Sequence, residues 1–327
     1  MNNSDRPLIE LDPGVSEKAV DTSFGGRDRR RRLSIKGLLY LAGTLLFLLS
    51  LAYVVRFAIH NRSFLEQNLD VEPATLITAS LLYALTHVSS SAAWMAGLRA
   101  MGHPLPFKTG MQISLVAQIA KYLPGNVIHY VTRAGLARHL GVQLSSSGLV
   151  TAIEIVATLI AAAFVASLAL AISPAPIGAI DAALADRVGP AVFVVCGAFL
   201  LTGAVLRWMH VPLRAVIATA AWLVISFLLI GLSFHMIVAA TAPVALSPLS
   251  TIGVFAIAWA AGYAVPGAPA GLGIREAILV AWLGPMVGGG AAIACAALHR
   301  IVTAIVDAIA AVVGYWRLHG RKAGNVA

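Results

Sequence analysis

Long apolar runs separated by short charged loops are the feature that most constrains this chain. Its 327 residues are 59% hydrophobic and only 11% charged, which excludes an ordinary soluble domain. An α-helix needs roughly 20 apolar residues to cross the hydrocarbon core of a bilayer. The sequence therefore predicts an all-α, polytopic transmembrane helix bundle. The uninterrupted spans are expected at residues 38–59, 74–98, 149–172, 188–206, 214–240 and 290–316.

Two further apolar stretches, residues 111–138 and 250–284, are interrupted by proline and glycine. Proline removes a backbone donor and glycine permits dihedrals that other residues resist, so a regular helix cannot continue through these positions. Inside a bilayer, irregular backbone is tolerated only where protein buries it or where it lines a wet cavity. We therefore expect two re-entrant helical hairpins. Their tips are expected at Pro124, Gly125, Pro266, Gly267, Pro269 and Gly271.

The interrupted stretches share one plan: a tyrosine, then Pro-Gly, then an arginine nine residues after the proline. A chance match in so apolar a chain is the alternative explanation. Hairpins that enter from opposite faces are typical of inverted-repeat transporters, whose sites lie near the midplane. The matched positions are Tyr122, Pro124 and Arg133 in the first stretch, and Tyr263, Pro266 and Arg275 in the second.

Positive charge gathers in the N-terminal tail and in short loops. The net charge is +9 and the pI is about 10.0, but this distribution indicates topology and no nucleic-acid partner. Residues 1–36 are expected to form a disordered basic tail, residues 37–317 one integral membrane domain, and residues 318–327 a second tail. The positive-inside rule places both tails in the cytoplasm, provided that each interrupted stretch leaves on the side where it entered.

Several ionisable residues lie within the apolar segments. Each costs a few kcal/mol at the bilayer centre, so these residues should face one another. A structural ion-pair network is the alternative to a functional site, and Glu154 alone could also extend toward the interface. Arg275 and Glu276 are neighbours in sequence, so we expect each to have a different partner. The predicted buried charge network comprises Glu154, Glu276, Arg300 and Asp307, with His87 and His299 as weaker members.

Catalytic signatures are missing from the sequence. It has no Walker loop and no His-Glu-x-x-His motif, and Cys196 and Cys295 lack metal-ligand spacing. We expect no enzymatic activity, no cofactor and no metal. A membrane-embedded transferase, the remaining enzymatic alternative, would have only Glu154 or Glu276 as its acid or base.

One family shares the motifs of the interrupted stretches. The residues Lys121-Tyr-Leu-Pro-Gly125, the run Pro266-Gly-Ala-Pro-Ala-Gly-Leu-Gly-Ile-Arg-Glu276, and Arg133, Gly135, Glu154 and Arg300 resemble the lysylphosphatidylglycerol synthase/flippase transmembrane-domain family. The resemblance covers roughly residues 36–318 and implies lipid handling in the bacterial inner membrane. Because the aminoacyltransferase domain of the bifunctional members is missing, we expect no synthesis of lysyl-lipid.

Two functions follow as hypotheses. The first is a lipid translocase or lipid-headgroup-binding transporter for an anionic or zwitterionic phospholipid, or for a polyprenyl or hopanoid lipid. The second is a non-transporting accessory that binds lipid and tethers a separate cell-envelope enzyme. A membrane lipid is the expected partner, and a homo-oligomer is left open. The residues expected to bind the headgroup are Lys121, Asn126, Arg133, Gly273 and Arg275.

Overall fold

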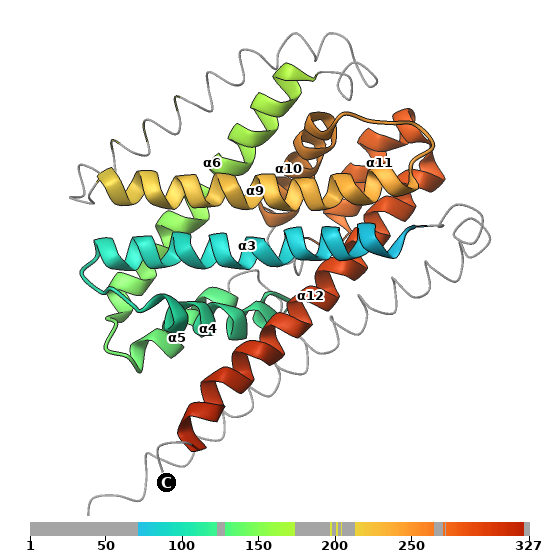
Figure 1. Cartoon of the computed structure of the whole chain (residues 1–327). Helices are drawn as coiled ribbons and strands as arrows, with labels where there is room; N and C mark the ends of the chain where they lie inside the picture. The colour runs from blue at the N-terminus through green and yellow to red at the C-terminus, as the bar shows by residue number, and fades with distance from the viewer. Residues whose placement is uncertain are drawn as a thin grey trace, which may run out of the picture.

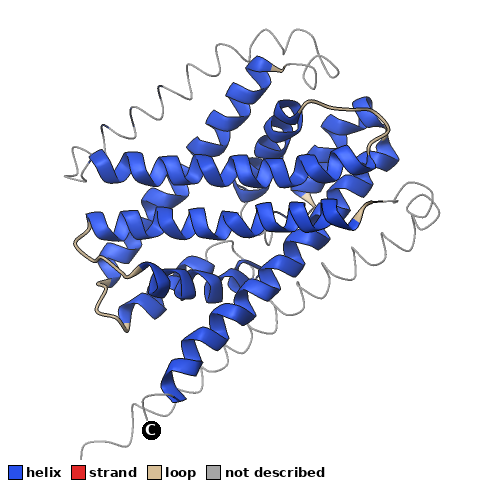
Figure 2. Cartoon of the chain, in the orientation of Figure 1, coloured by secondary structure: helices blue, strands red, loops and turns tan. Residues whose placement is uncertain are grey.

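The computed structural model describes residues 71–122, 128–173, 213–264, 271 and 273–323, together with Gly197, Leu201 and Ala204. Over these residues the chain forms eight α-helices and one 3₁₀ helix, and it contains no strand (Figure 2). The expected spans at 38–59 and 188–206 and the tail at 1–36 lie outside the described residues, apart from the three isolated positions.

Four helices are long and apolar enough to cross a membrane: α3 (Pro73–Ala100), α6 (Leu144–Ile172), α9 (Leu213–Thr241) and α12 (Gly289–Ala323). They agree with four of the six expected spans, and α12 continues into the expected C-terminal tail. Their outer faces are apolar, as the exposed Ile77, Leu81 and Leu85 of α3 show. Exposed apolar residues spaced four apart suit a lipid environment.

Helices α3 and α9 run antiparallel at the centre of the bundle (Figure 1). Two hydrogen bonds between hydroxyls of α9 and carbonyls of α3 follow this antiparallel register. Ser233 Oγ donates to the oxygen of Ala79 at 2.7 Å, and Thr219 Oγ1 donates to the oxygen of Ala93 at 3.3 Å. Such bonds between helices join transmembrane segments where no hydrophobic driving force acts between them.

In both interrupted stretches the described helices end before the predicted tips and resume after them. The first forms α4 (Phe107–Ala117), η1 (Gln118–Tyr122) and α5 (Ile128–Arg138). The second forms α10 (Pro248–Ala264) and α11 (Ile274–Val287). Of the expected tip residues, only Gly271 lies within the described part of the chain.

Two glycines bring α10 close to the start of α11. An added Cβ on Gly262 would lie 3.1 Å from the Cα of Gly271, and Gly271 has a φ of +71°. A side chain at Gly262 would meet backbone, and one at Gly271 would also be strained, because residues with a side chain rarely adopt this conformation. Glycine therefore permits the close backbone contact between the two helices.

Helix α12 packs against parts of both interrupted stretches. It contacts α11, which precedes it, and α4 and η1 of the first stretch. Near its C-terminal end, Gly314 lies directly against Leu115 and Val116 of α4. The helix therefore joins the two stretches, and its side chains can reach both.

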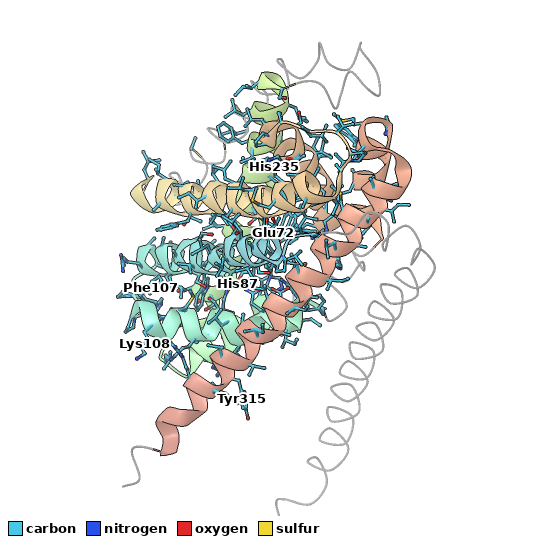
Figure 3. All side chains as sticks on the ribbon, turned by 45° about the vertical axis from the view of Figure 1, so that its right-hand side comes forward. Glu72, His87, Phe107, Lys108, His235 and Tyr315 are labelled. Atoms are coloured by element: carbon cyan, nitrogen blue, oxygen red, sulfur yellow. The ribbon has the colours of Figure 1, made fainter. Side chains whose placement is uncertain are left out.

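Opposite ends of the bundle differ in charge. At one end Arg99, Lys108 and Arg138 are exposed, and Lys108 lies on the outside of α4 (Figure 3). The other end carries the exposed Glu72 and a hydrogen-bonded group of serine hydroxyls that joins α6 to α10. The asymmetry among the described residues agrees with the expected placement of the Arg- and Lys-rich end in the cytoplasm.

Candidate functional site

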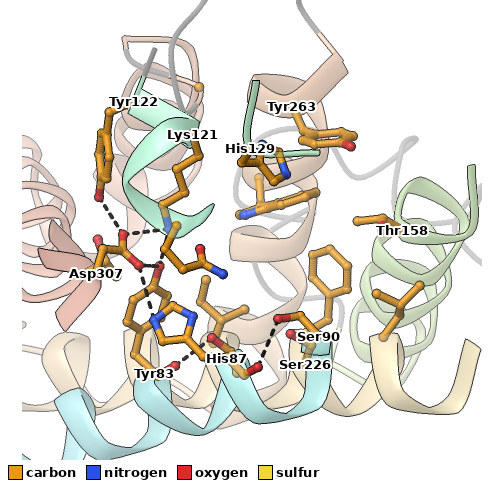
Figure 4. A pocket seen from close by; sticks show the side chains of 18 of the residues that line it. Tyr83, His87, Ser90, Lys121, Tyr122, His129, Thr158, Ser226, Tyr263 and Asp307 are labelled. Carbon is orange, nitrogen blue, oxygen red and sulfur yellow. Dashed lines mark hydrogen bonds and ion pairs between the residues drawn. The ribbon is translucent and has the colours of Figure 1, made fainter. Parts of the chain in front are cut away.

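A cavity of about 200 Å³ lies where helices α3, α6, α9 and α12 meet both interrupted stretches (Figure 4). Most of the predicted charged residues line it, although they come from distant parts of the sequence. The structure therefore brings members of the predicted headgroup-binding set and of the predicted charge network into one site. The residues of the predicted binding site, tips and charge network that lie on its wall are His87, Lys121, Arg133, Glu154, Gly271, Arg275, Arg300 and Asp307.

Asp307 of α12 is the centre of a polar cluster on one side of the cavity (Figure 4), and its side chain is fully buried. Tyr83 donates a hydrogen bond to Oδ1 at 3.0 Å, and Tyr122 donates one to Oδ2 at 2.6 Å. The Nζ of Lys121 lies 2.6 Å from Oδ2, and the Nε2 of His87 lies 3.3 Å from Oδ1. Both carboxylate oxygens are therefore already engaged.

A second ion pair joins the first interrupted stretch to α6. Arg133 donates a hydrogen bond to Glu154, and both side chains are buried. The guanidinium of Arg133 also lies over the rings of Trp94 and Tyr130, at 4.6 and 5.2 Å from their centroids. Glu154 is thus paired within the bundle, so the alternative that it extends toward the interface is wrong. Stacking and pairing together stabilise both charges.

The third group of charges is paired more loosely. The Oε1 of Glu276 lies 3.5 Å from Arg275 and 3.8 Å from Arg300, which are ion-pair distances and too long for good hydrogen bonds. Arg275 is 6% exposed, and its buried Nε has no hydrogen-bond partner. Arg275 and Glu276 were expected to have different partners. Glu276 does have another partner, Arg300, but the long side chain of Arg275 also reaches back to Glu276.

The two interrupted stretches touch across the cavity. The hydroxyls of Tyr130, near the start of α5, and Tyr263, near the end of α10, are 2.7 Å apart. Tyr263 stacks on Trp259, with ring centroids 4.8 Å apart. The two tyrosines that occupy matched positions in the interrupted stretches therefore make different contacts: Tyr122 contacts Asp307, whereas Tyr263 contacts Tyr130.

Some predicted residues lie elsewhere. Gly273 is exposed and outside the cavity, and its N–H donates to Oε2 of Glu276 at 2.8 Å, so the helix's own carboxylate occupies the donor expected to hold a phosphate. Glu276 itself stands behind Arg275 and Arg300 and is not on the wall. His299 is packed among Phe234 and Phe255. Asn126 and the predicted tips other than Gly271 lie outside the described residues.

The sequence reasoning missed the uncharged polar residues of the site. They stand on otherwise apolar helices, where a single serine or threonine is common and carries no functional signal. A search for hydroxyl side chains at helical spacing on α3 would have found the first two. The main additions are Thr86, Ser90, Thr158, Ser226, Tyr130 and Thr303.

Cationic side chains outnumber carboxylates on the cavity wall. Two carboxylates line the wall, those of Glu154 and Asp307, whereas the cationic side chains there are Lys121, Arg133, Arg275 and Arg300. Glu276, which is not on the wall, neutralises only part of this excess positive charge. Buried charge of one sign favours a ligand of the other sign. The arrangement suits an anion, and over the described residues no group of histidine, cysteine or acidic side chains is placed to hold a metal ion.

No protein-family model matches the chain, and no curated protein matches it significantly. The resemblance therefore rests on the quoted motifs alone, and function has to be argued from the site.

Proposed function

We propose that the chain is a lipid translocase, or a transporter that binds lipid headgroups, of the bacterial inner membrane. The observation that carries the proposal is the buried cavity in which cations from both interrupted stretches outnumber carboxylates. The phosphate group of a lipid would supply the negative charge that the cavity wall lacks. The four long apolar helices suit a protein that lies in a lipid bilayer. The acyl chains would stay in the bilayer while the headgroup occupies the cavity.

Arg275 is the residue we assign to the phosphate. It is buried, it lines the cavity, and its contact with Glu276 leaves hydrogen-bonding capacity unused. Arginine binds phosphate oxygens strongly because its donors form a planar fork. The buried Nε of Arg133 also has no hydrogen-bond partner, but Arg133 already donates to Glu154 and stacks on aromatic rings, so we assign it a mainly supporting role.

We further propose that both interrupted stretches are re-entrant hairpins inserted from opposite leaflets. The contact between Tyr130 and Tyr263 supports this arrangement, because each residue lies within a few positions of a helix break. In inverted-repeat transporters the broken helices meet at the substrate site in this way. The resemblance to the lysylphosphatidylglycerol synthase/flippase transmembrane family is a second, motif-based support.

The test is movement of labelled lipid between leaflets of vesicles that contain the purified full chain. We expect Arg275→Gln to slow the movement by at least about tenfold, because losing a charge-assisted phosphate contact costs about 1.5–3 kcal/mol. Arg99→Gln, a matched change of an exposed arginine, should leave the rate unchanged. Gel filtration confirms that both variants are folded.

Two results would contradict this proposal, one for the role of Arg275 and one for translocation itself. Equal rates for wild type and Arg275→Gln would remove the residue from the mechanism. Lipid binding that depends on Arg275 without any movement between leaflets would favour the alternative of a non-transporting accessory, whose partner would be a cell-envelope enzyme.

A further inference from the structure

We propose that the cavity selects a small anionic headgroup with free hydroxyls, of the phosphoglycerol type, over headgroups that carry an amine. The inference rests on the proposed lipid binding and names the class of lipid. Three properties of the wall carry it: the acceptors that it offers, the state of its carboxylates and its size.

Hydroxyl side chains on the wall are acceptors toward the cavity. Thr86, Thr158 and Thr303 donate to carbonyls of their own helices at 2.6, 2.6 and 3.0 Å, and Ser90 does so at 3.4 Å. A hydroxyl that has donated its proton keeps its lone pairs, so it can only accept from a ligand. The wall thus combines cationic donors for phosphate oxygens with neutral acceptors for the donors of a headgroup.

The donors that match these acceptors are hydroxyls and not ammonium groups. An ammonium group in a cavity needs a carboxylate, but both oxygens of Asp307 are engaged by Tyr83, Tyr122, Lys121 and His87. Glu154, the other carboxylate on the wall, is paired with Arg133. An ammonium group would therefore meet an excess of positive charge, whereas a hydroxyl would not.

The volume of the cavity limits the headgroup. Its volume of about 200 Å³ is below the roughly 300–1,000 Å³ of sites that enclose drug-sized ligands. A phosphate with a three-carbon polyol fits such a space. A headgroup extended by a sugar or by an amino-acyl group would need a larger one.

Three lipids with the same acyl chains separate these properties: phosphatidylglycerol, phosphatidylmethanol and phosphatidylethanolamine. The first two have the same charge and differ in hydroxyls, and the third adds an ammonium group. Binding to the purified full chain is measured by native mass spectrometry. We expect phosphatidylglycerol to bind about tenfold more tightly than phosphatidylmethanol, since two hydrogen bonds of about 0.5–1.5 kcal/mol each are involved. Phosphatidylethanolamine should bind most weakly.

The second part of the experiment removes one hydroxyl group from the cavity wall. Thr86→Val should lower the preference for phosphatidylglycerol over phosphatidylmethanol about threefold and leave phosphatidylmethanol binding unchanged. If Thr86→Val does not fold, Thr158→Val is measured in its place. The matched control is Thr78→Val on the same helix, because Thr78 also donates to its own helix at 2.8 Å but is exposed outside the cavity.

Failure of the inference and failure of the proposed function give different results. Equal binding of the three lipids, or a preference that Thr86→Val and Thr158→Val leave intact, overturns the selectivity while Arg275→Gln still weakens all binding. Lipid binding that Arg275→Gln leaves intact overturns the phosphate site and, with it, the inference.

Discussion

The buried carboxylates of the cavity are satisfied to different degrees. Asp307 has tyrosine, lysine and histidine partners, Glu154 has one arginine, and Glu276 has two arginines at longer distances. A buried charge is costly unless its partners replace the lost water. The loosest of the three groups, around Glu276 and Arg275, is therefore the one that an incoming anion can rearrange at least cost.

The pair between Arg133 and Glu154 can be tested by its effect on stability. Glu154→Gln leaves the buried Arg133 without a counter-charge, so we expect the unfolding free energy to fall by about 3–5 kcal/mol. The measurement is thermal unfolding in detergent. Exposed Glu72 offers the matched control, and Glu72→Gln should have almost no effect.

Replacing both partners distinguishes a lost pair from lost packing. The double variant Arg133→Met, Glu154→Leu should recover most of the stability, because apolar groups of similar size often replace a buried ion pair without loss. If Glu154→Gln unfolds like wild type, the buried pair does not stabilise the bundle.

At the scale of elements, the helix breaks determine where the cavity forms. Helix α10 ends at Ala264 and α11 begins at Ile274, and the backbones of Gly262 and Gly271 touch beside the break. The contact holds Arg275 of α11 close to Tyr263 of α10. The position of the arginine therefore depends on residues that have no charge.

Gly262→Ala tests this contact. The added Cβ would meet the backbone of Gly271 at 3.1 Å, so we expect a loss of about 1–3 kcal/mol and weaker lipid binding through displacement of Arg275. Gly148→Ala in α6 is the matched helical control, because nothing lies within 4 Å of its added Cβ. It should raise stability by up to about 1 kcal/mol. The same change in stability for both variants would contradict the close-contact interpretation.

At the scale of the molecule, charge at the two ends predicts the orientation in the membrane. The end with Arg99, Lys108 and Arg138 is expected in the cytoplasm, and the end with Glu72 outside. Both ends of α3 agree with this assignment, since Arg99 lies in its last turn and Glu72 precedes its first.

Labelling of single cysteines with a membrane-impermeant maleimide tests the orientation. Cys196 and Cys295 are first replaced by alanine. Val244→Cys, at an exposed position between α9 and α10, should react in intact inner-membrane vesicles of right-side-out orientation. Lys108→Cys should react only after permeabilisation. The reverse pattern would contradict the positive-inside assignment.

The sequence was sufficient for the four long helices that the structure describes, and much less so for the contacts between residues within the site. Apolar length predicted α3 at 74–98, close to its observed bounds of Pro73–Ala100, and the described helices of both interrupted stretches lie on either side of the predicted tips. Pairing depends on how helices rotate about their axes, which apolar periodicity does not fix when most faces are hydrophobic. For this reason the sequence predicted the charged residues of the site. It predicted neither the tyrosine contacts of Asp307 nor the threonines on the cavity wall.

Helix α12 carries both Arg300 and Asp307, seven residues apart, and each contacts a different interrupted stretch. Seven residues correspond to about 10 Å along a helix axis, and a helix is stiff over that length. Because α12 carries both contacts, we expect a displacement of one stretch to displace the other as well.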